Sequence, residues 1–359
     1  MKIFILLAIL SAVSAQNFFG FNVPKVPSFS NSPLLNRFSQ IPLLNNVQDF
    51  GDFVAQSGKQ YATAAEKTLR EGIFRANQAL IDSNNKAWEL GQSAFKLGAN
   101  IFADLSPTEF LSKLAGLKRS SAGDAKASAH KEAASVPTNA NIPDSFDWRD
   151  HGAVTPVKFQ GLDCNSCWSF AVTGAVEGHY FRKTKSLVPL SEQNLIDCSQ
   201  NYGNVGCSGG YQEYGFNYII ENQGIAKSEP YPYKMMDDKC NYRRDIKGAD
   251  MQAFAVIAPG DEKTLKEAVA TKGPVACSMC VVETFVLYEK GIYDDQKCNE
   301  GDVNHSVLVI GYGTENGRDY WIIKNSYSDK WGEGGYGRIP RNENSFCGIA
   351  SECSYPIIN

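Results

Sequence analysis

The sequence predicts an α+β protein in which a mainly helical half is followed by a strand-rich half. Residues 166–182 contain no proline and only two glycines, and residues 190–197 have the composition of a short helix. Residues 306–310 and 320–323 are short β-branched or aromatic runs bounded by glycines or polar turns, which is typical of strands. When a helical half lies beside a β half, the cleft between them is the expected binding site.

The N-terminus reads MKIFILLAILSAVSAQ, with a lysine, an apolar run and a small-residue stretch at 13–15. This order predicts a signal peptide over residues 1–15; the alternative is a buried N-terminal helix. No other stretch reaches the roughly 18 apolar residues that a membrane span needs. We therefore expect entry into the secretory pathway and no membrane span.

Residues 16 to about 45 have no clear period and are interpreted as an extended lead-in. A helix follows, and steps of three and four place six residues on one stripe of it. These residues are Glu66, Arg70, Phe74, Asn77, Ile81 and Asn85. Glu66 and Arg70 are spaced as an i, i+4 ion pair that acid should weaken.

Three further segments complete the N-terminal region. Residues 98–104 indicate a strand or turn. A second helix should begin near Pro107, with Ser106 as its cap and Glu109 three residues later. Residues 118–141 are small and polar without aromatics, which predicts a linker with no core of its own, open to proteolysis. Aromatics, glycines and cysteines become dense from residue 142, so we expect a compact domain over 142–359.

The charge balance argues against nucleic-acid binding. The chain has 35 Lys and Arg against 39 Asp and Glu, a formal net charge of −4, with no long run of one sign. Its ten cysteines all lie at or after residue 164, and the secretory route permits them to form disulfides.

Cys167 is the candidate nucleophile, within the string QGLDCNSCWSF. It directly precedes a predicted helix, and a thiolate at a helix N-terminus is stabilised by the dipole and by free N–H groups. The alternative is a C-x-x-C redox pair with Cys164.

His305 is the candidate base among only four histidines. His130 lies in the predicted linker, His151 in a polar stretch and His179 inside a helix, and a surface or structural role suits each of them. His305 opens a buried-looking strand 138 residues after Cys167. A Cys/His pair oriented by a third residue is a general nucleophilic arrangement, and Asn325 is the candidate third member.

These motifs resemble the papain-like cysteine proteases, closest to the cathepsin L group. The resemblance covers about residues 48–359 and depends on the helical stripe, residues 98–104 and the blocks 160–161, 164–170, 304–305, 324–326 and 331–332. It implies a two-lobed fold with a helical lobe and a β-barrel-like lobe. It also implies a propeptide over 16–141, with an inhibitory helical prodomain over about 48–117, and a mature domain over 142–359.

The implied activity is that of a monomeric, lysosomal or extracellular endopeptidase, made as a zymogen and activated in acid. Its partners would be protein and peptide substrates, its own propeptide and cystatin-type inhibitors; no cofactor or metal is implied. The implied catalytic residues are Cys167, His305, Asn325 and, as an oxyanion-hole donor, Gln160. The implied substrate-binding residues are Gly209, Gly210, Tyr211, Gln212, Val303, Asn304, Ser306, Trp331 and Glu352.

Glu352 falls where the resemblance places the floor of the pocket for the second residue before the scissile bond. With Gln212 it would let that pocket accept arginine as well as apolar side chains, since a charge-assisted pair favours arginine. The alternative is a solvated glutamate near the C-terminus.

The resemblance also implies three disulfides, namely Cys164–Cys207, Cys198–Cys240 and Cys298–Cys347. This pairing leaves Cys167 free. Cys277, Cys280 and Cys353 are expected to be buried, inert thiols, because no second pair is spaced for a zinc site. Cys277 and Cys280 should point to opposite faces of a strand.

Two strings mimic other enzymes. Residues 206–210 fit G-x-S-x-G but lack the strand and helix of a nucleophile elbow, and residues 332–337 fit G-x-G-x-x-G but precede a strand. The glycosylation sequon at Asn304 should be unmodified, because a sugar there would block His305.

Four departures from the family pattern stand near the site. One extra residue precedes Cys164, Asn165 and Ser328 replace glycines, and Tyr327 replaces the tryptophan that shields the Asn–His hydrogen bond. We expect reduced shielding without loss of function. Two other hypotheses stay open, a catalytically silent binding or storage protein and a thiol–disulfide oxidoreductase.

Overall fold

The computed structural model describes residues 41–135 and 141–359, so the predicted signal peptide and most of the lead-in lie outside it. The first helices and strands are α2 (Phe50–Ser57), α3 (Ala64–Glu89), β1 (Phe95–Leu97), α4 (Pro107–Leu114), α5 (Ser121–Ala127) and β2 (Lys131–Ala133). The helices of the later region are α6 (Cys167–Thr184), α7 (Glu192–Cys198), α8 (Gln212–Glu221), α9 (Glu262–Thr271) and α10 (Glu283–Val286). Its strands are β3 (Phe146–Asp147), β4 (Ile225–Ala226), β5 (Lys247–Ala249), β6 (Ala253–Ile257), β7 (Val275–Met279), β8 (Tyr288–Gly291), β9 (His305–Glu315), β10 (Arg318–Lys324), β11 (Tyr336–Pro340) and β12 (Cys353–Ile357).

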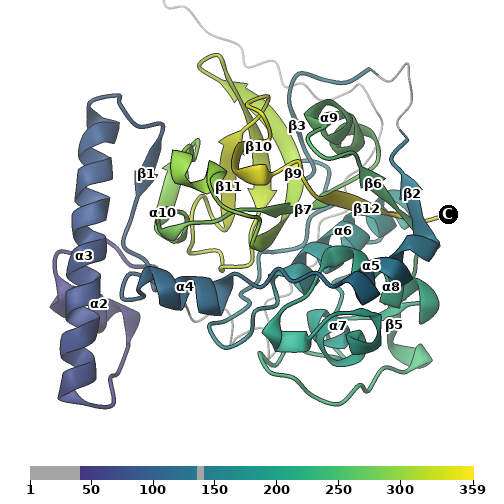
Figure 1. Cartoon of the computed structure of the whole chain (residues 1–359), viewed down its shortest axis with the longest axis horizontal. Helices are drawn as coiled ribbons and strands as arrows, with labels where there is room; N and C mark the ends of the chain where they lie inside the picture. Colours follow the sequence, from purple (N-terminus) through teal and green to yellow (C-terminus); the bar gives the residue numbers. More distant parts are fainter. Residues whose placement is uncertain (1–40, 136–140) are drawn as a thin grey trace, which may run out of the picture.

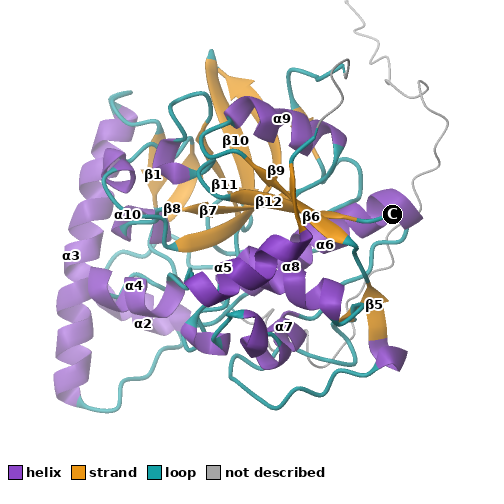
Figure 2. Ribbon diagram, turned by 45° about the vertical axis from the view of Figure 1, so that its right-hand side comes forward, coloured by secondary structure: helices purple, strands orange, loops and turns teal. Residues whose placement is uncertain are grey.

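The β lobe is built on one open sheet in the order β11-β10-β9-β7-β12-β6-β2, with β3 also paired to β9. Every pair in it is antiparallel except β2–β6. Helices α6, α7 and α8 gather below the sheet in Figure 1, and Figure 2 shows the same separation of strands from helices. The predicted α+β fold with a helical and a β lobe is therefore confirmed, although the β lobe is not a closed barrel.

Helix α6 packs against the sheet and joins the two lobes. Its residues from Cys167 to His179 are buried except Phe170, so this part of the helix is enclosed on nearly every side. A Cβ at Gly174 would collide with the Leu308 side chain of β9. The glycine therefore brings the helix close to the strand that carries His305.

The N-terminal region folds around α3, which stands along one side of the molecule (Figure 1). Phe74 and Ile81 of the predicted stripe are buried, and Phe74 lies in an aromatic cluster with Phe50 and Phe53. Asn77 donates hydrogen bonds to the Ala103 and Leu105 carbonyls, and Asn85 donates one to the Leu97 carbonyl. Residues 101–104 form a turn, and Ser106 and Glu109 form the predicted capping box of α4.

The expected Glu66–Arg70 ion pair is wrong. Arg70 pairs with Glu109 at 2.8 Å and also donates to the Asp104 carbonyl. The Glu66 carboxylate instead accepts the N–H of Ala62, the residue before the Thr63 N-cap of α3, at 2.8 Å. The Arg70 pair holds the pKa of Glu109 down at about 2, so this contact survives mild acid.

The stretch that we interpreted as a linker with no core of its own, residues 118–141, contains regular secondary structure. This stretch forms α5 and β2, and β2 adds a parallel strand beside β6. Gly123 lies against the ring of Tyr214, where a Cβ would not fit, and Ala127 is buried. Small residues permit this close packing, whereas composition alone favours a loop.

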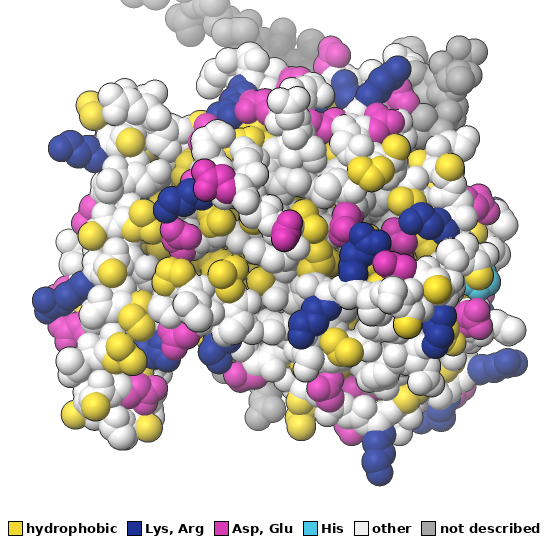
Figure 3. Space-filling model, in the orientation of Figure 1, with side chains coloured by type: hydrophobic (Ala, Val, Ile, Leu, Met, Phe, Trp, Pro, Cys, Tyr) yellow, Lys and Arg dark blue, Asp and Glu magenta, His cyan; other side chains and the backbone are white. Residues whose placement is uncertain are grey.

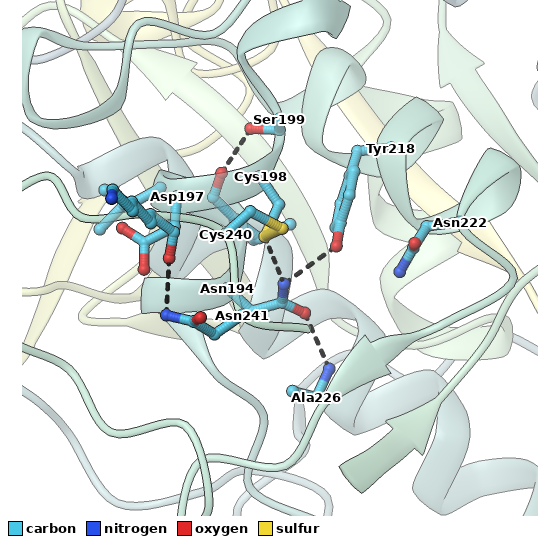
Figure 4. The surroundings of a disulfide bond; sticks show 12 residues. Asn194, Asp197, Cys198, Ser199, Tyr218, Asn222, Ala226, Cys240 and Asn241 are labelled. Carbon is cyan, nitrogen blue, oxygen red and sulfur yellow. Dashed lines mark hydrogen bonds between the residues drawn. A yellow bond between two sulfur atoms is a disulfide. The ribbon is translucent and has the colours of Figure 1, made fainter. Parts of the chain in front are cut away.

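All ten cysteines lie in the described residues, and eight are paired. The three implied disulfides are present, and Figure 4 shows Cys198–Cys240 with the Asn194 amide donating to Cys198 Sγ at 3.2 Å. The expectation that Cys277 and Cys353 are inert thiols is wrong, since they form a fourth disulfide. The register places them directly opposite each other on β7 and β12, with Cα atoms 4.2 Å apart. Cys280 is a free, buried thiol.

Across the described ranges no helix is both long enough and apolar enough to cross a bilayer.

Replacing Phe74 by alanine should destabilise the N-terminal region by about 3–5 kcal/mol, because the ring is 2% exposed and leaves a cavity. Thermal or urea unfolding of the full chain carrying Cys167→Ser measures this. Leu69→Ala is the matched control, since Leu69 lies on the same helix and is 59% exposed. Equal destabilisation by both variants would contradict the packing described.

Candidate active site

Cys167 is the first residue of α6, and Ser166 is the N-cap. Its thiol is free and buried. Burial raises the pKa of this thiol, while backbone N–H groups of Ser306, Gly116 and Trp168 act in the opposite direction by hydrogen bonding. Burial is the largest of these effects, so the surroundings of the sulfur disfavour the thiolate.

His305 begins β9, and its ring is fully buried. Its Nε2 lies 2.9 Å from the Oδ1 of Asn325, which follows β10. The Ser326 N–H also donates to that oxygen at 2.8 Å, so the oxygen accepts and Nε2 must carry the proton. Burial lowers the pKa of His305 to about 4, although the Asn325 and Leu114 oxygens favour its protonation. The structure thus brings His305 and Asn325 together as the sequence predicted.

The chain between α4 and α5 crosses this site (Figure 1). The Leu114 carbonyl lies 3.2 Å from His305 Nδ1. Further on, Leu117 N–H donates to the Asn304 carbonyl, and Gly210 N–H donates to the Gly116 carbonyl at 2.9 Å. A Cβ on Gly116 would collide with the Asn165 carbonyl, so only glycine fits there. Sequence analysis missed Leu114 and Gly116, because no motif marks a segment that only covers a site.

Gln160 is fully buried beside this site. Its amide oxygen accepts the Ser326 hydroxyl at 2.7 Å, and its amide nitrogen donates to the Cys164 carbonyl at 3.4 Å. Asn165, which replaces a glycine, donates its side-chain amide to the Ser112 carbonyl of α4. Cys164 is bonded to Cys207, so Cys167 has no C-x-x-C redox partner.

Tyr327 is buried, and its ring packs at a tilt against the His305 ring with centroids 5.0 Å apart. Its hydroxyl lies 3.5 Å from His305 Nδ1 and 3.3 Å from the Leu114 carbonyl. Trp331 packs edge-on against Tyr327, with ring centroids 5.7 Å apart. The tyrosine therefore covers the imidazole and adds a hydroxyl that an indole ring would not place there.

Several of the expected pocket residues contact the chain between α4 and α5. Arg119 stacks over Tyr211 at 4.8 Å and pairs with Glu352 at 2.7 Å. Gln212 donates to the Glu352 main-chain oxygen and accepts from Ser306, so it does not contact the carboxylate. Gly209 has a φ of 122°, and its neighbour Gly210 forms the backbone hydrogen bonds to the segment. Val303 lies near Gly348.

Asn304 uses its side-chain amide within the protein. Its Oδ1 accepts the Val281 N–H at 2.9 Å, and its Nδ2 donates to the Val281 carbonyl. A sugar on Nδ2 would break the second contact, which supports the prediction of an unmodified sequon.

A buried ionic cluster behind the site was not found from the sequence. Lys158 pairs with Glu192 at 2.6 Å and with Glu177 at 3.5 Å, and Lys324 donates to Thr155. Lys324 directly precedes Asn325, so the cluster ties this end of β10 to the helical lobe. These residues are far apart in the chain, and no spacing marks them. The described residues hold no group of three or more His, Cys, Asp or Glu side chains that could bind a metal ion.

Comparison with known proteins identifies the class. Residues 142–357 match the papain family of cysteine proteases, and residues 50–110 match the cathepsin propeptide inhibitor domain (I29). The chain therefore belongs to the papain family and is a cysteine protease with a zymogen propeptide.

Several of its relatives carry cathepsin L names. A cathepsin L-like peptidase of Aedes aegypti is 42% identical over 316 residues, which cover 87% of this chain and 93% of that protein. A cathepsin L-like protein of Caenorhabditis elegans is 41% identical over 361 residues and 100% of both chains. The solved structure of digestive procathepsin L 3 from the Tenebrio molitor larval midgut has a TM-score of 0.79 and 37% identity, covering 91% of this chain and 100% of that chain. The resemblance to the cathepsin L group is confirmed.

The zymogen should lose stability as the pH falls from about 6.5 to about 4. A histidine in the unfolded chain binds a proton below about pH 6.5, whereas buried His305 binds one only below about pH 4. Acid therefore favours the unfolded state over the folded zymogen. The loss is on the order of 3 kcal/mol. Unfolding of the Cys167→Ser full chain across this pH range measures it, and His305→Gln should flatten the slope. His179, whose pKa burial lowers to about 3, accounts for part of the slope that remains. An unchanged slope in His305→Gln would contradict the assignment.

Proposed function

We propose that this protease is an endopeptidase in which Cys167, His305 and Asn325 perform acyl transfer. The supporting observation is the Nε2 hydrogen bond of His305 to Asn325, beside a free thiol at the start of α6. Asn325 fixes the ring so that Nδ1 is free to take the thiol proton once Leu114 leaves.

The chemistry proceeds through a thioester. The Cys167 proton moves to His305 Nδ1, and the thiolate attacks the substrate carbonyl carbon to form a C–S bond. The imidazolium then protonates the leaving amine as the C–N bond breaks. Water next attacks the thioester carbon as its proton passes to His305, and the C–S bond breaks as His305 returns that proton to the Cys167 sulfur and the carboxylic acid product leaves. Gln160 and the Cys167 N–H would stabilise the oxyanion, an effect worth about 10²–10³ in rate for one donor.

We infer that the segment Leu114–Lys118 keeps the zymogen inactive by desolvating both partners. The raised pKa of Cys167 and the lowered pKa of His305 disfavour the thiolate–imidazolium pair. Acid favours protonated His305 and hence departure of the segment, so we propose autocatalytic removal at low pH. We further propose that residues 1–15 are a signal peptide, residues 16–141 a propeptide and residues 142–359 the monomeric mature enzyme. The mature enzyme would work in lysosomes or outside the cell. Its partners would be protein substrates and cystatin-type inhibitors.

Cys167→Ser should lower the release of dye from a dipeptide substrate by about 10⁴-fold or more, because the nucleophile is lost. A thiol-alkylating epoxide should abolish the activity of the parent enzyme. Cys280→Ser is the matched control, since Cys280 is the other free, buried thiol and should be dispensable.

The same variants test activation. The parent zymogen should shorten in acid, as followed by intact mass, and Cys167→Ser should stay whole. A zymogen that stays intact in acid, with Cys167→Ser no different, would end the activation proposal. Full activity in Cys167→Ser would contradict the proposal that Cys167 is the nucleophile.

We also propose that the pocket at Glu352 accepts arginine at the second residue before the scissile bond. Arg119 of the propeptide supports this, because its guanidinium pairs with Glu352 and stacks on Tyr211. The carboxylate is 17% exposed, so solvent screens the pair only in part.

In a peptide library, Glu352→Ala should lower kcat/KM for arginine at that position at least about tenfold relative to leucine. Glu300→Ala is the control, because Glu300 is exposed. Rejection of arginine by the parent enzyme, or no change in Glu352→Ala, would contradict the pocket assignment.

A further inference from the structure

Residues 118–133 lie between the two matched families, after the inhibitor domain that ends at residue 110 and before the protease domain that begins at residue 142. We call them the basic segment, because they carry Lys118, Arg119, Lys126 and Lys131 against Asp124 and Glu132. They bind a face of the protease domain that bears Glu213, Glu221 and Glu352, here called the acidic face. Figure 3 shows basic and acidic side chains beside one another over the region of α5 and β2.

Two ion pairs and one histidine–carboxylate contact cross this interface. Arg119 pairs with Glu352 at 2.7 Å, Lys131 with Glu213 at 3.4 Å, and His130 Nε2 lies 3.1 Å from a Glu221 oxygen. Glu213 is the most informative, because its side chain is only 7% exposed. Burying a carboxylate is costly unless a cation pairs with it, and Lys131 supplies the cation.

Backbone and aromatic contacts fix the segment in register. The Ser120 N–H donates to the Tyr214 hydroxyl at 2.7 Å, and that hydroxyl lies 2.8 Å from an Asp124 oxygen. At the far end of the segment, β2 and β6 are neighbouring parallel strands in which Lys131 lies opposite Phe254 in the register. The Ala134 N–H donates to the Val256 carbonyl at 2.9 Å. The basic segment thus covers the edge strand of the main sheet, whose N–H and C=O groups would otherwise face solvent.

We propose that the basic segment is a second docking element, separate from the helical prodomain, and that it binds the acidic face. It thereby anchors the C-terminal end of the segment Leu114–Lys118, which covers the cleft. The prodomain anchors the other side, through β1 on β8 and the Lys96–Glu289 pair at 3.4 Å. The segment Leu114–Lys118 over Cys167 is therefore held at both ends. This inference goes beyond the proposed catalysis, because it concerns binding and holds whether or not the enzyme turns over.

Charge exchange in the full chain carrying Cys167→Ser tests the proposal by amide hydrogen exchange and mass spectrometry. Lys131→Glu places two carboxylates together and should speed exchange of residues 118–134 at least about tenfold. The double variant Lys131→Glu with Glu213→Lys restores opposite charges and should return exchange to within a few-fold of the parent. Because the pairs are partly exposed, raising the salt concentration should also speed exchange in this segment.

Lys96→Glu is the matched control, since it breaks a pair of equal length on the other anchor. It should speed exchange in β1 and leave residues 118–134 unchanged. The proposal is overturned if Lys131→Glu exchanges like the parent, if the double variant is no slower than the single one, or if Lys96→Glu loosens residues 118–134 equally.

A functional readout separates this proposal from the catalytic one. In the otherwise unaltered full chain near neutral pH, Lys131→Glu should shorten the time to half-maximal peptide hydrolysis several-fold, and the charge-reversed double variant should restore the delay. Failure of the proposed protease activity would remove this readout and leave the exchange results standing. Normal activity with an unchanged delay would overturn the anchoring role.

Discussion

The central constraint in this structure is the burial of one thiol and one imidazole beneath the segment Leu114–Lys118 of the same chain. Cys167 and His305 are both shielded from water, and burial moves their pKa values in the directions that oppose a thiolate–imidazolium pair. The Leu114 carbonyl lies 3.2 Å from His305 Nδ1. In the mechanism that we propose, the zymogen is inactive because this carbonyl and the loss of solvent act on a site whose Asn325–His305 contact is already made.

The rest of the fold positions the segment Leu114–Lys118 against the Cys167 and His305 side chains. Helix α6 delivers the thiol, β9 delivers the imidazole, and Gly174 lets the two elements approach. Lys158, Glu177 and Glu192 tie the lobes together in a buried ionic cluster behind Asn325. Removing one partner from such a cluster leaves a buried charge without compensation, which costs more than the pair itself contributes.

The propeptide contacts divide by their response to solution conditions. The Arg70–Glu109 pair keeps the pKa of Glu109 near 2, so it persists when His305 begins to bind protons. The aromatic packing of Phe74 does not depend on pH. We therefore propose that acid acts first on the covered imidazole, whereas salt acts on the partly exposed pairs of the basic segment. Under this proposal, release of the covering segment and unfolding of the prodomain are separable events.

Local patterns determined much of this protein. The stripe containing Phe74, the Ser106 cap and the strand at 306–310 follow from side-chain period and backbone donors. The helical run at 166–182 and the strand runs predicted the fold class, and the start of that helix and the small number of histidines indicated Cys167 and His305. Tertiary structure alone decided the partner of Arg70, the Cys277–Cys353 bond and the docking of residues 118–133. Each of these depends on which distant surface lies opposite, and a linear sequence records the chemistry of a side chain without recording what faces it.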